Sequence, residues 1–348
     1  MSNLKYLVLI QAVIIIILSG VILNLSSRPI QNNLSGTASQ SADQRLLSSR
    51  VYSNTFPPGS FSVLNFFPLK RSIGEYIKKN NYKMSVYVEN FKSGAGFGIN
   101  EKDGYLPVSI TKVLVAIVIM RAIERGDLTL DTMVDIKDSD KLDTSGTLFL
   151  NAEKKMPLRA LLRYMLHESD NTALRVLKRY VNPEDKMLIS NYIGYYSGQN
   201  AGQPDTDEED AHSLVTPKAI YNLFSSLYLS TILKPEHSEF ILSSLVDSVF
   251  DIKRLAELPE DVTVAHKLGA RYTQDARCFH DCGIMYIHST DMRLFYCIMS
   301  KDLDEQTAMN TTAWFLKAIY SFSMNSRDTF DSYKAKFLEE SSSVKQKQ

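Results

Sequence analysis

The stretch Ser109-Ile110-Thr111-Lys112 stands directly before the uninterrupted apolar run Val113–Met120 and decides how this chain folds. Such a run, closed by Gly126, predicts a buried helix over 109–125 with Ser109 in its first turn. Residues three apart lie on one helix face, so we expect the Lys112 ammonium to reach the Ser109 hydroxyl. A lysine in a dry pocket can lose its proton near neutral pH and activate a serine nucleophile. The stretch therefore predicts an acyl-transfer centre at a helix start, where free N–H groups can bind an oxyanion.

The pattern Ser-x-x-Lys is weak alone, because it occurs at Ser2–Lys5, Ser109–Lys112 and Ser342–Lys345. The first copy precedes an apolar segment and the last lies in a polar tail. Only the middle copy opens a hydrophobic helix that can desolvate its lysine. Taken alone, even that copy fits an ordinary helix start, so its companions decide its meaning.

Two further elements follow the serine along the chain. Ser169-Asp170-Asn171 also suits a helix–helix turn, in which Asp170 caps the next helix. His266-Lys267-Leu268-Gly269-Ala270 ends a β-like run, and a glycine there lets a substrate approach the strand edge. Lys92-Ser93-Gly94 fits a Lys-Ser/Thr-Gly pattern better, but it precedes Ser109 and is typical of a hairpin turn. We therefore take the element at 266–270.

In this order, the three elements resemble the signature of the serine β-lactamase and penicillin-binding protein superfamily, and of class A β-lactamases most closely. The resemblance covers about residues 70–325. It implies an α/β (α+β) fold of the β-lactamase/transpeptidase type, with a five-stranded antiparallel sheet, flanking helices and an inserted helical subdomain. Beyond the motifs, it rests on Ser85–Gly94, Tyr105–Ser109, Ile123–Asp131, Val215–Ile220 and His280–Tyr286.

The resemblance also implies a role for each motif residue. Ser109 would be the acyl-forming nucleophile, and Lys112 its base or a relay to one. Ser169 would pass a proton to the leaving nitrogen, and Asn171 would hold Lys112 and the substrate side chain. Lys267 would attract a substrate carboxylate and hydrogen-bond Ser169. The substrate-binding positions would be Gly269, Ala270 and Arg271, with the N–H groups of Ser109 and Ala270 forming the oxyanion hole.

Leu268 is the first departure from the family pattern, which has Thr or Ser between the lysine and the glycine. A hydroxyl that would bind the substrate carboxylate is missing, and one such hydrogen bond contributes about 1.5–3 kcal/mol. Arg271 could compensate in part, although we favour a solvated arginine at a strand end.

The Ω-loop is the second departure. Class A enzymes carry Glu-x-x-Leu-Asn there, and its glutamate activates the water that clears the acyl-enzyme, but 190–216 contains no such motif. Asn200 falls near the expected position, and we interpret the acidic run around it as a solvated loop. Without a carboxylate at the acyl carbonyl, the enzyme could stay acylated, as penicillin-binding proteins do. The nearby carboxylates are Asp205, Asp207, Glu208, Glu209 and Asp210.

The N-terminal segment predicts a membrane anchor. Tyr6–Leu25 has no charged residue and is long enough to span a bilayer as a helix. We interpret 1–25 as an uncleaved signal-anchor, with cleavage near Thr37-Ala38-Ser39 as the alternative. The superfamily works outside the cytoplasm, which implies a membrane-anchored, extracytoplasmic protein. The rest divides into a flexible polar tether at 26–59, the hydrolase domain at 60–326 and a polar tail at 327–348.

Hydrophobic periodicity predicts the elements of the domain. It places Trp314, Phe315 and Ile319 in the core and the site between the sheet and the inserted helices. The predicted strands are 83–90, 97–100, 262–268, 282–288 and 293–299. The predicted helices are 72–79, 109–125, 157–167, 172–180, 217–229, 236–247 and 305–323.

Composition excludes several classes of function. The formal net charge is +0, so no basic patch indicates nucleic-acid binding. Cys278, His280 and Cys282 alternate along one strand and do not converge on a metal, and we expect no metal and no cofactor. We favour buried free thiols over a Cys282–Cys297 disulfide. His266 and His280 are expected to be structural rather than catalytic.

We therefore expect a serine hydrolase that forms an acyl-Ser109 intermediate, with β-lactam hydrolysis as the leading hypothesis. The alternative is a D,D-peptidase-type cell-wall hydrolase that binds penicillin and deacylates slowly. A third hypothesis is a catalytically weak domain that binds or senses muropeptides. The expected partners are a β-lactam, a D-amino-acid amide or a peptidoglycan-related small molecule, together with the membrane.

Overall fold

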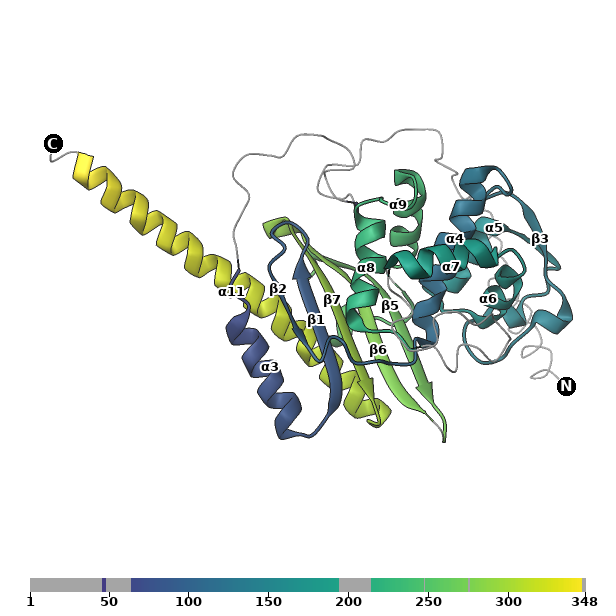
Figure 1. Ribbon diagram of the computed structural model, residues 1–348, viewed down its shortest axis with the longest axis horizontal. Helices are drawn as coiled ribbons and strands as arrows, with labels where there is room; N and C mark the ends of the chain where they lie inside the picture. The colour runs from purple at the N-terminus through teal and green to yellow at the C-terminus, as the bar shows by residue number, and fades with distance from the viewer. Residues whose placement is uncertain (1–45, 48–63, 194–213, 247, 275, 346–348) are drawn as a thin grey trace, which may run out of the picture. The chain divides into compact units, whose positions relative to one another are not determined.

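The structure is a computed structural model that describes residues 46–47, 64–193, 214–246, 248–274 and 276–345 (Figure 1). The predicted membrane segment, nearly all of the polar tether and most of the Ω-loop lie outside these residues. None of the helices within them is both long and apolar enough to cross a bilayer.

A five-stranded antiparallel sheet in the order β2-β1-β7-β6-β5 forms the centre of the domain and confirms the expected fold. The inner strands β6 and β7 are buried along nearly their whole length, because both of their faces are covered by helices. Strands β5 and β6 are longer than periodicity predicts, since their pairing continues from the apolar residues to Tyr272 and Arg277. The strands are β1 (Lys83–Asn90), β2 (Gly96–Ile99), β5 (Val262–Tyr272), β6 (Arg277–Ile287) and β7 (Met292–Lys301).

Helices α3 (Phe67–Lys79) and α11 (Glu305–Lys345) cover one face of the sheet (Figure 1). Phe315 and Ile319 are fully buried there, as predicted, but Trp314 is 46% exposed and was wrongly expected in the core. One residue along a helix turns the side chain by about 100°, which brings Trp314 to the edge, where its ring lies 4.7 Å from that of Tyr76. The helix also continues to Lys345 through the expected tail, whose Lys, Glu and Ala residues favour helix without apolar periodicity.

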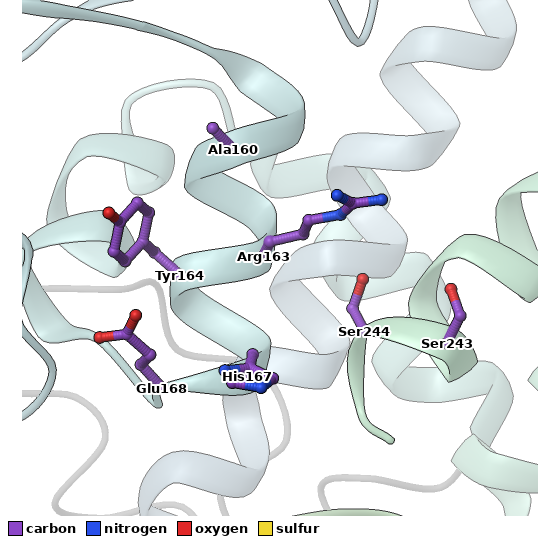
Figure 2. Close-up of a pocket in the computed structure, with 7 residues that line it drawn as sticks. All are labelled: Ala160, Arg163, Tyr164, His167, Glu168, Ser243 and Ser244. Atoms are coloured by element: carbon purple, nitrogen blue, oxygen red, sulfur yellow. The ribbon is translucent and has the colours of Figure 1, made fainter. Parts of the chain in front are cut away.

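The other face of the sheet carries the inserted helices and a small sheet of β3 (Met133–Asp135) and β4 (Lys155–Pro157). Five of these helices approximate their predictions, whereas α7 was missed, because Met187 and Leu188 are exposed and obscure its apolar face. A pocket lies between α5 and α9 (Figure 2). The helices on this face are α4 (Thr111–Arg125), α5 (Leu158–His167), α6 (Asn171–Lys178), α7 (Pro183–Ile193), α8 (Pro217–Tyr228) and α9 (Pro235–Ser244). The short α10 (Ile252–Leu255), which was not predicted either, contacts α11 and β5 instead.

Helix α4 is the central element of the helical part, and its residues from Lys112 to Met120 are all buried. A helix that is apolar on every face must pack against neighbouring elements on every side to keep its side chains out of water. It ends at Gly126, whose φ of 87° is readily adopted only by glycine, and whose N–H bonds the carbonyls of Ala122 and Ile123.

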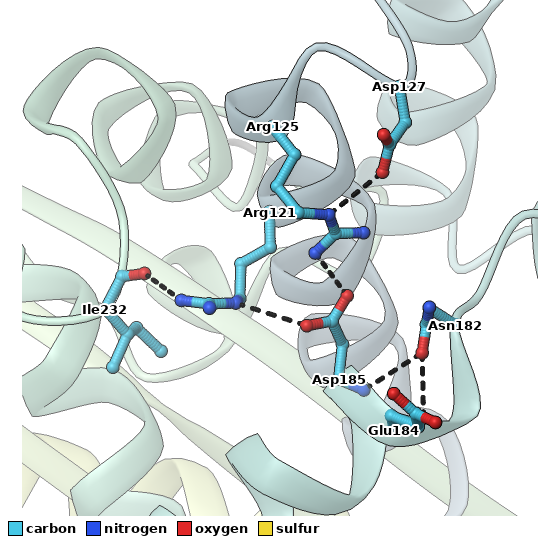
Figure 3. Close-up of polar contacts among 7 residues, drawn as sticks. All are labelled: Arg121, Arg125, Asp127, Asn182, Glu184, Asp185 and Ile232. Carbon is cyan, nitrogen blue, oxygen red and sulfur yellow. Dashed lines mark hydrogen bonds and ion pairs between the residues drawn. The ribbon is translucent and has the colours of Figure 1, made fainter.

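An ion-pair cluster joins the end of α4 to α7 (Figure 3). Arg125 donates to Asp185 at 2.5 Å and to Asp127 at 2.9 Å, while the Arg121 Nε lies 3.6 Å from the Asp185 carboxylate. Arg121 also donates to the Ile232 carbonyl at 3.4 Å. The Asp185 side chain is only 12% exposed, so this cluster fixes the start of the helix that leads toward the Ω-loop.

The cysteines differ from the sequence-based expectation. Cys282 and Cys297 are directly paired on β6 and β7 and form a disulfide, so the preference for free thiols was wrong at these two positions. Their register in the sheet, which no motif reveals, brings the two sulfur atoms to the same face. Cys278 is free and buried.

Candidate active site

Ser109 lies in a 3₁₀ turn, Val108–Ile110, and α4 begins only at Thr111, which corrects the expected helix start. The preceding Val108 has a φ of 43°, a region that a β-branched residue rarely adopts and that costs about 1–3 kcal/mol. Strand β5 packs directly on this turn. A Cβ at Gly269 would lie 2.5 Å from the Val108 Cγ2 atom and 3.3 Å from the Ile110 Cγ1 atom, so only glycine permits the contact.

The Lys112 side chain is 1% exposed and points toward the turn before α6. Its Nζ donates to the Asn171 Oδ1 at 2.7 Å, to the Ser169 Oγ at 3.2 Å and to the Ser169 carbonyl. Burial lowers the pKa of Lys112 to about 7, against an opposing effect of the Asp170 carboxylate. The hydrogen bond expected from Lys112 to Ser109 is not among those of the described residues. The structure thus brings Lys112, Ser169 and Asn171 into direct contact.

The turn at 169–171 is held from its neighbours as well as from α4. Asp170 caps α6 by accepting from the Ala173 N–H at 2.7 Å, and its other oxygen accepts from the Leu148 N–H at 2.8 Å. Ser169 has a φ of 56°, so the turn is held in a conformation that a serine rarely adopts unaided. Burial raises the pKa of Asp170. The turn therefore presents Ser169 and Asn171 on a fixed support.

Sequence reasoning missed the loop that packs against this turn. The Asn171 amide donates to the Thr144 hydroxyl at 2.8 Å, and the Ser145 hydroxyl donates to the Ser169 carbonyl at 2.9 Å. Gly146 has a φ of 84°, and a Cβ there would lie 2.1 Å from the Asp170 carboxylate. A Thr-Ser-Gly run signals a turn but says nothing of its partner, so these contacts could not be found from the sequence.

Lys267 is 2% exposed and projects from β5 on the face opposite to His266, because side chains alternate along a strand. Burial and repulsion by Lys112 lower its pKa well below the usual value, and Asp281 opposes the shift. Its Nζ donates to the Leu268 carbonyl at 3.1 Å, and the expected hydrogen bond to Ser169 is not among those of the described residues. Lys267 therefore lies close enough to Lys112 for that side chain to lower its pKa.

Of the predicted substrate-binding positions, Gly269 is buried against Val108, whereas Ala270 and Arg271 are exposed at the end of β5. The guanidinium of Arg271 is thus at the surface, as the solvated interpretation requires. No set of three or more His, Cys, Asp or Glu side chains in the described ranges is arranged to hold a metal ion.

Both histidines near the site lie in buried hydrogen-bond networks. His280 donates from Nε2 to the Leu106 carbonyl at 2.9 Å, and burial lowers its pKa to about 4. His266 Nδ1 lies 2.8 Å from the Asp281 carboxylate and its Nε2 lies 2.9 Å from the Ser248 hydroxyl. His280 therefore secures the segment before Ser109, and His266 secures the segment beside Lys267.

Comparison with known proteins places this geometry in a family. Residues 68–322 match the model of the β-lactamase enzyme family. A β-lactamase from Phocaeicola vulgatus is 29% identical over 191 residues, which cover 51% of this chain and 59% of that protein. The match thus spans less than two thirds of that relative's length. The β-lactamase VEB-1 from Pseudomonas aeruginosa is 22% identical over 256 residues, covering 70% of this chain and 85% of that protein.

The solved structures agree on the fold. PBP-A superposes with a TM-score of 0.66 at 17% identity and covers 78% of this chain and 100% of its own. A variant of PBP-A has been solved as an acyl-enzyme complex with penicillin G. Since the family model spans well over half of the sequence, the chain belongs to the β-lactamase enzyme family and is a β-lactamase-like serine hydrolase.

Proposed function

We propose that the chain hydrolyses the amide of β-lactams through a covalent acyl-Ser109 intermediate. The observation that carries this proposal is the buried Lys112, whose pKa of about 7 leaves a large neutral fraction at physiological pH. A neutral amine in hydrogen-bond contact with Ser169 and Asn171 is a competent base.

The proposed acylation step moves one proton and exchanges one bond. The Ser109 Oγ attacks the β-lactam carbonyl carbon as its proton passes to the Lys112 Nζ. The N–H groups of Ser109 and Ala270 bind the oxyanion that forms. The C–N bond then breaks, and Ser169 delivers a proton to the leaving nitrogen, replenished from Lys112. The substrate carboxylate binds at Lys267 and favours its ammonium form, which opposes the lowering of its pKa by burial.

A D,D-peptidase-type activity with slow deacylation is the second candidate. Leu268 removes a hydroxyl for the substrate carboxylate, and 190–216 contains no Glu-x-x-Leu-Asn. The acyl complex of PBP-A with penicillin G is a precedent on the same fold. A weak muropeptide-sensing domain is the third candidate, and it requires an inactive Ser109.

One experiment separates these candidates. The full chain is incubated with penicillin G and with a chromogenic cephalosporin, and both product formation and intact mass are followed. Turnover supports a β-lactamase, whereas a stable adduct without turnover supports the penicillin-binding alternative. Ser109→Ala must abolish both signals, and Ser93→Ala, in the hairpin turn, is the matched control. The absence of adduct and turnover in the native chain would refute acylation of Ser109 by β-lactams.

We also propose that residues 1–25 anchor the enzyme in a membrane with the hydrolase domain outside the cytoplasm. The support is the uncharged apolar segment Tyr6–Leu25, which has the length of a bilayer-spanning helix. Membranes washed at alkaline pH should retain the full chain and release one that lacks residues 1–25. Protease added to intact cells should degrade the domain, and protection of the domain would contradict the proposed orientation.

A further inference from the structure

The pocket between α5 and α9 has a volume of about 440 Å³ and lies outside the residues assigned to acylation (Figure 2). Arg163, Tyr164 and His167 line it from α5, and Ser243 and Ser244 line it from α9. Pockets of this size hold small organic ligands, which are oriented by a few polar groups. The chemistry of these five side chains therefore indicates what the pocket can bind.

Three of the lining side chains are hydrogen-bond donors that have no hydrogen-bond or ion-pair partner among the described residues. They are the Arg163 guanidinium, the Tyr164 hydroxyl and the His167 ring. Arg163 is exposed, and within the described part of the chain its contact is a cation–π one, with its Cζ 5.6 Å from the centroid of the Phe240 ring. Figure 2 shows the Arg163 side chain extending from α5 toward the side on which Ser243 and Ser244 lie. A guanidinium in this position can bind a carboxylate through two parallel hydrogen bonds.

The remaining polar groups are already engaged. The Ser243 and Ser244 hydroxyls donate to the Phe240 carbonyl at 3.0 and 2.7 Å. Glu168 is the only acidic side chain of the lining, and its carboxylate accepts from the Thr147 hydroxyl at 2.6 Å and from the Thr147 N–H at 3.2 Å. The polar groups of the lining that lack a partner among the described residues are thus hydrogen-bond donors, while Ala160 and the Tyr164 ring supply apolar surface.

The C-terminal end of α5, which lines the pocket, also supports the turn that carries Ser169. The Tyr164 carbonyl accepts from the N–H groups of Glu168 and Asp170, both at 3.1 Å. The His167 carbonyl accepts from the Val249 N–H at 3.2 Å, next to Ser248, the hydrogen-bond partner of His266. A ligand in the pocket therefore contacts residues whose main chain holds the 169–171 turn in place.

We propose that the α5–α9 pocket is a binding site for a small organic carboxylate with a flat apolar body, held by Arg163. A ligand bound there would alter the environment of the turn at 169–171, because the main chain of the lining residues holds that turn. This site is additional to the proposed acylation centre and does not depend on it. The carboxylate would bind the Arg163 guanidinium on the side of Ser243 and Ser244, and the apolar body would lie along Ala160 and the Tyr164 ring.

The test is a titration of the ¹⁵N-labelled full chain with benzoate, followed by amide NMR, with benzamide as the uncharged control of the same shape. We expect saturable shifts at His167, Ser244 and Asp170 with benzoate, and affinity for benzamide lower by about tenfold or more, as the loss of a charge-assisted pair implies. Arg163→Gln should weaken benzoate by a similar factor. Arg254→Gln, an exposed arginine on α10, is the matched control and should leave the affinity unchanged.

Three results would overturn the proposal. They are the absence of saturable shifts, equal affinity for benzoate and benzamide, or Arg163→Gln binding benzoate as tightly as the native chain. Shifts restricted to α5 and α9, with the Asp170 amide unmoved, would refute the link to the catalytic turn. Lys267→Met separates this site from the proposed carboxylate subsite of the acylation centre, because it should leave benzoate binding unchanged. Binding is read without turnover, so failure here is distinct from failure of β-lactam hydrolysis.

Discussion

The pH dependence of acylation follows directly from the burial of Lys112. The pKa falls from 10.5 to about 7, because an ammonium that is 1% exposed loses its hydration. At pH 7 about half of the Lys112 side chains are then neutral, against about 0.03% for an unperturbed lysine, a gain on the order of a thousandfold in available base. The corresponding free-energy difference is about 5 kcal/mol at 1.36 kcal/mol per pKa unit.

We therefore expect the rate of Ser109 acylation by penicillin to rise with pH through an inflection near 7. Below pH 6 the rate should fall about tenfold per pH unit, because the base becomes protonated. The assay is intact-mass spectrometry of quenched reactions between pH 5 and 9, in which the penicillin carboxylate stays ionised. Lys112→Met should abolish the pH-dependent rate, and Lys78→Met, at an exposed position on α3, should leave it unchanged.

The same shift in the pKa of Lys112 predicts how the free energy of unfolding depends on pH. The folded-state pKa lies below the unfolded value, so the unfolded chain binds more protons between pH 7 and about 10. The cost of burying the charge is fully present below pH 7 and disappears as pH rises toward 10. At pH 6, Lys112→Met should be as stable as the native chain or more stable, by up to about 4 kcal/mol.

The acylation prediction has its own refutation. A rate of Ser109 acylation that is flat between pH 5.5 and 8.5, while Ser109→Ala blocks acylation, would refute Lys112 as the base.

Three further substitutions test other contacts of the site. Gly269→Ala places a Cβ 2.5 Å from the Val108 side chain, so it should lower the free energy of urea unfolding by about 1–3 kcal/mol and slow acylation. The control Gly74→Ala, whose Cβ would lie 3.9 Å from its nearest neighbour, should not destabilise α3. Equal stability of the two variants would contradict the close contact at Gly269. Asp281→Asn leaves His266 without its carboxylate and should lower the free energy of unfolding by about 3–5 kcal/mol, and a loss below about 1 kcal/mol would show that the pair contributes little. Leu268→Thr restores the hydroxyl that the family pattern implies and should lower KM for penicillin about tenfold with little change in kcat; an unchanged KM would place the substrate carboxylate elsewhere.

Several elements of the fold followed from local pattern. The apolar run after Lys112 predicted the buried helix α4, and alternating apolar residues predicted the sheet strands within a few residues. Helix α7 was missed, because Met187 and Leu188 are exposed and no apolar face stands out. The exposure of Trp314 could not be predicted, since it depends on which face a neighbouring element covers. The sequence allowed a Cys282–Cys297 disulfide but did not favour it over free thiols, because only the pairing of β6 with β7 sets the register of the two cysteines.

By itself the sequence determined which residues are candidates for the site, because Ser109, Lys112, Ser169, Asn171 and Lys267 stand in motifs of fixed spacing. The tertiary structure decided which of them are in contact. Lys112 turns toward Ser169 and Asn171, Gly269 admits the strained turn that carries Ser109, and the loop at 144–146 supports Asn171 from a segment without a motif. The physical reason is that a motif specifies side-chain chemistry, whereas burial, backbone strain and the pKa of Lys112 arise only when distant segments pack around it.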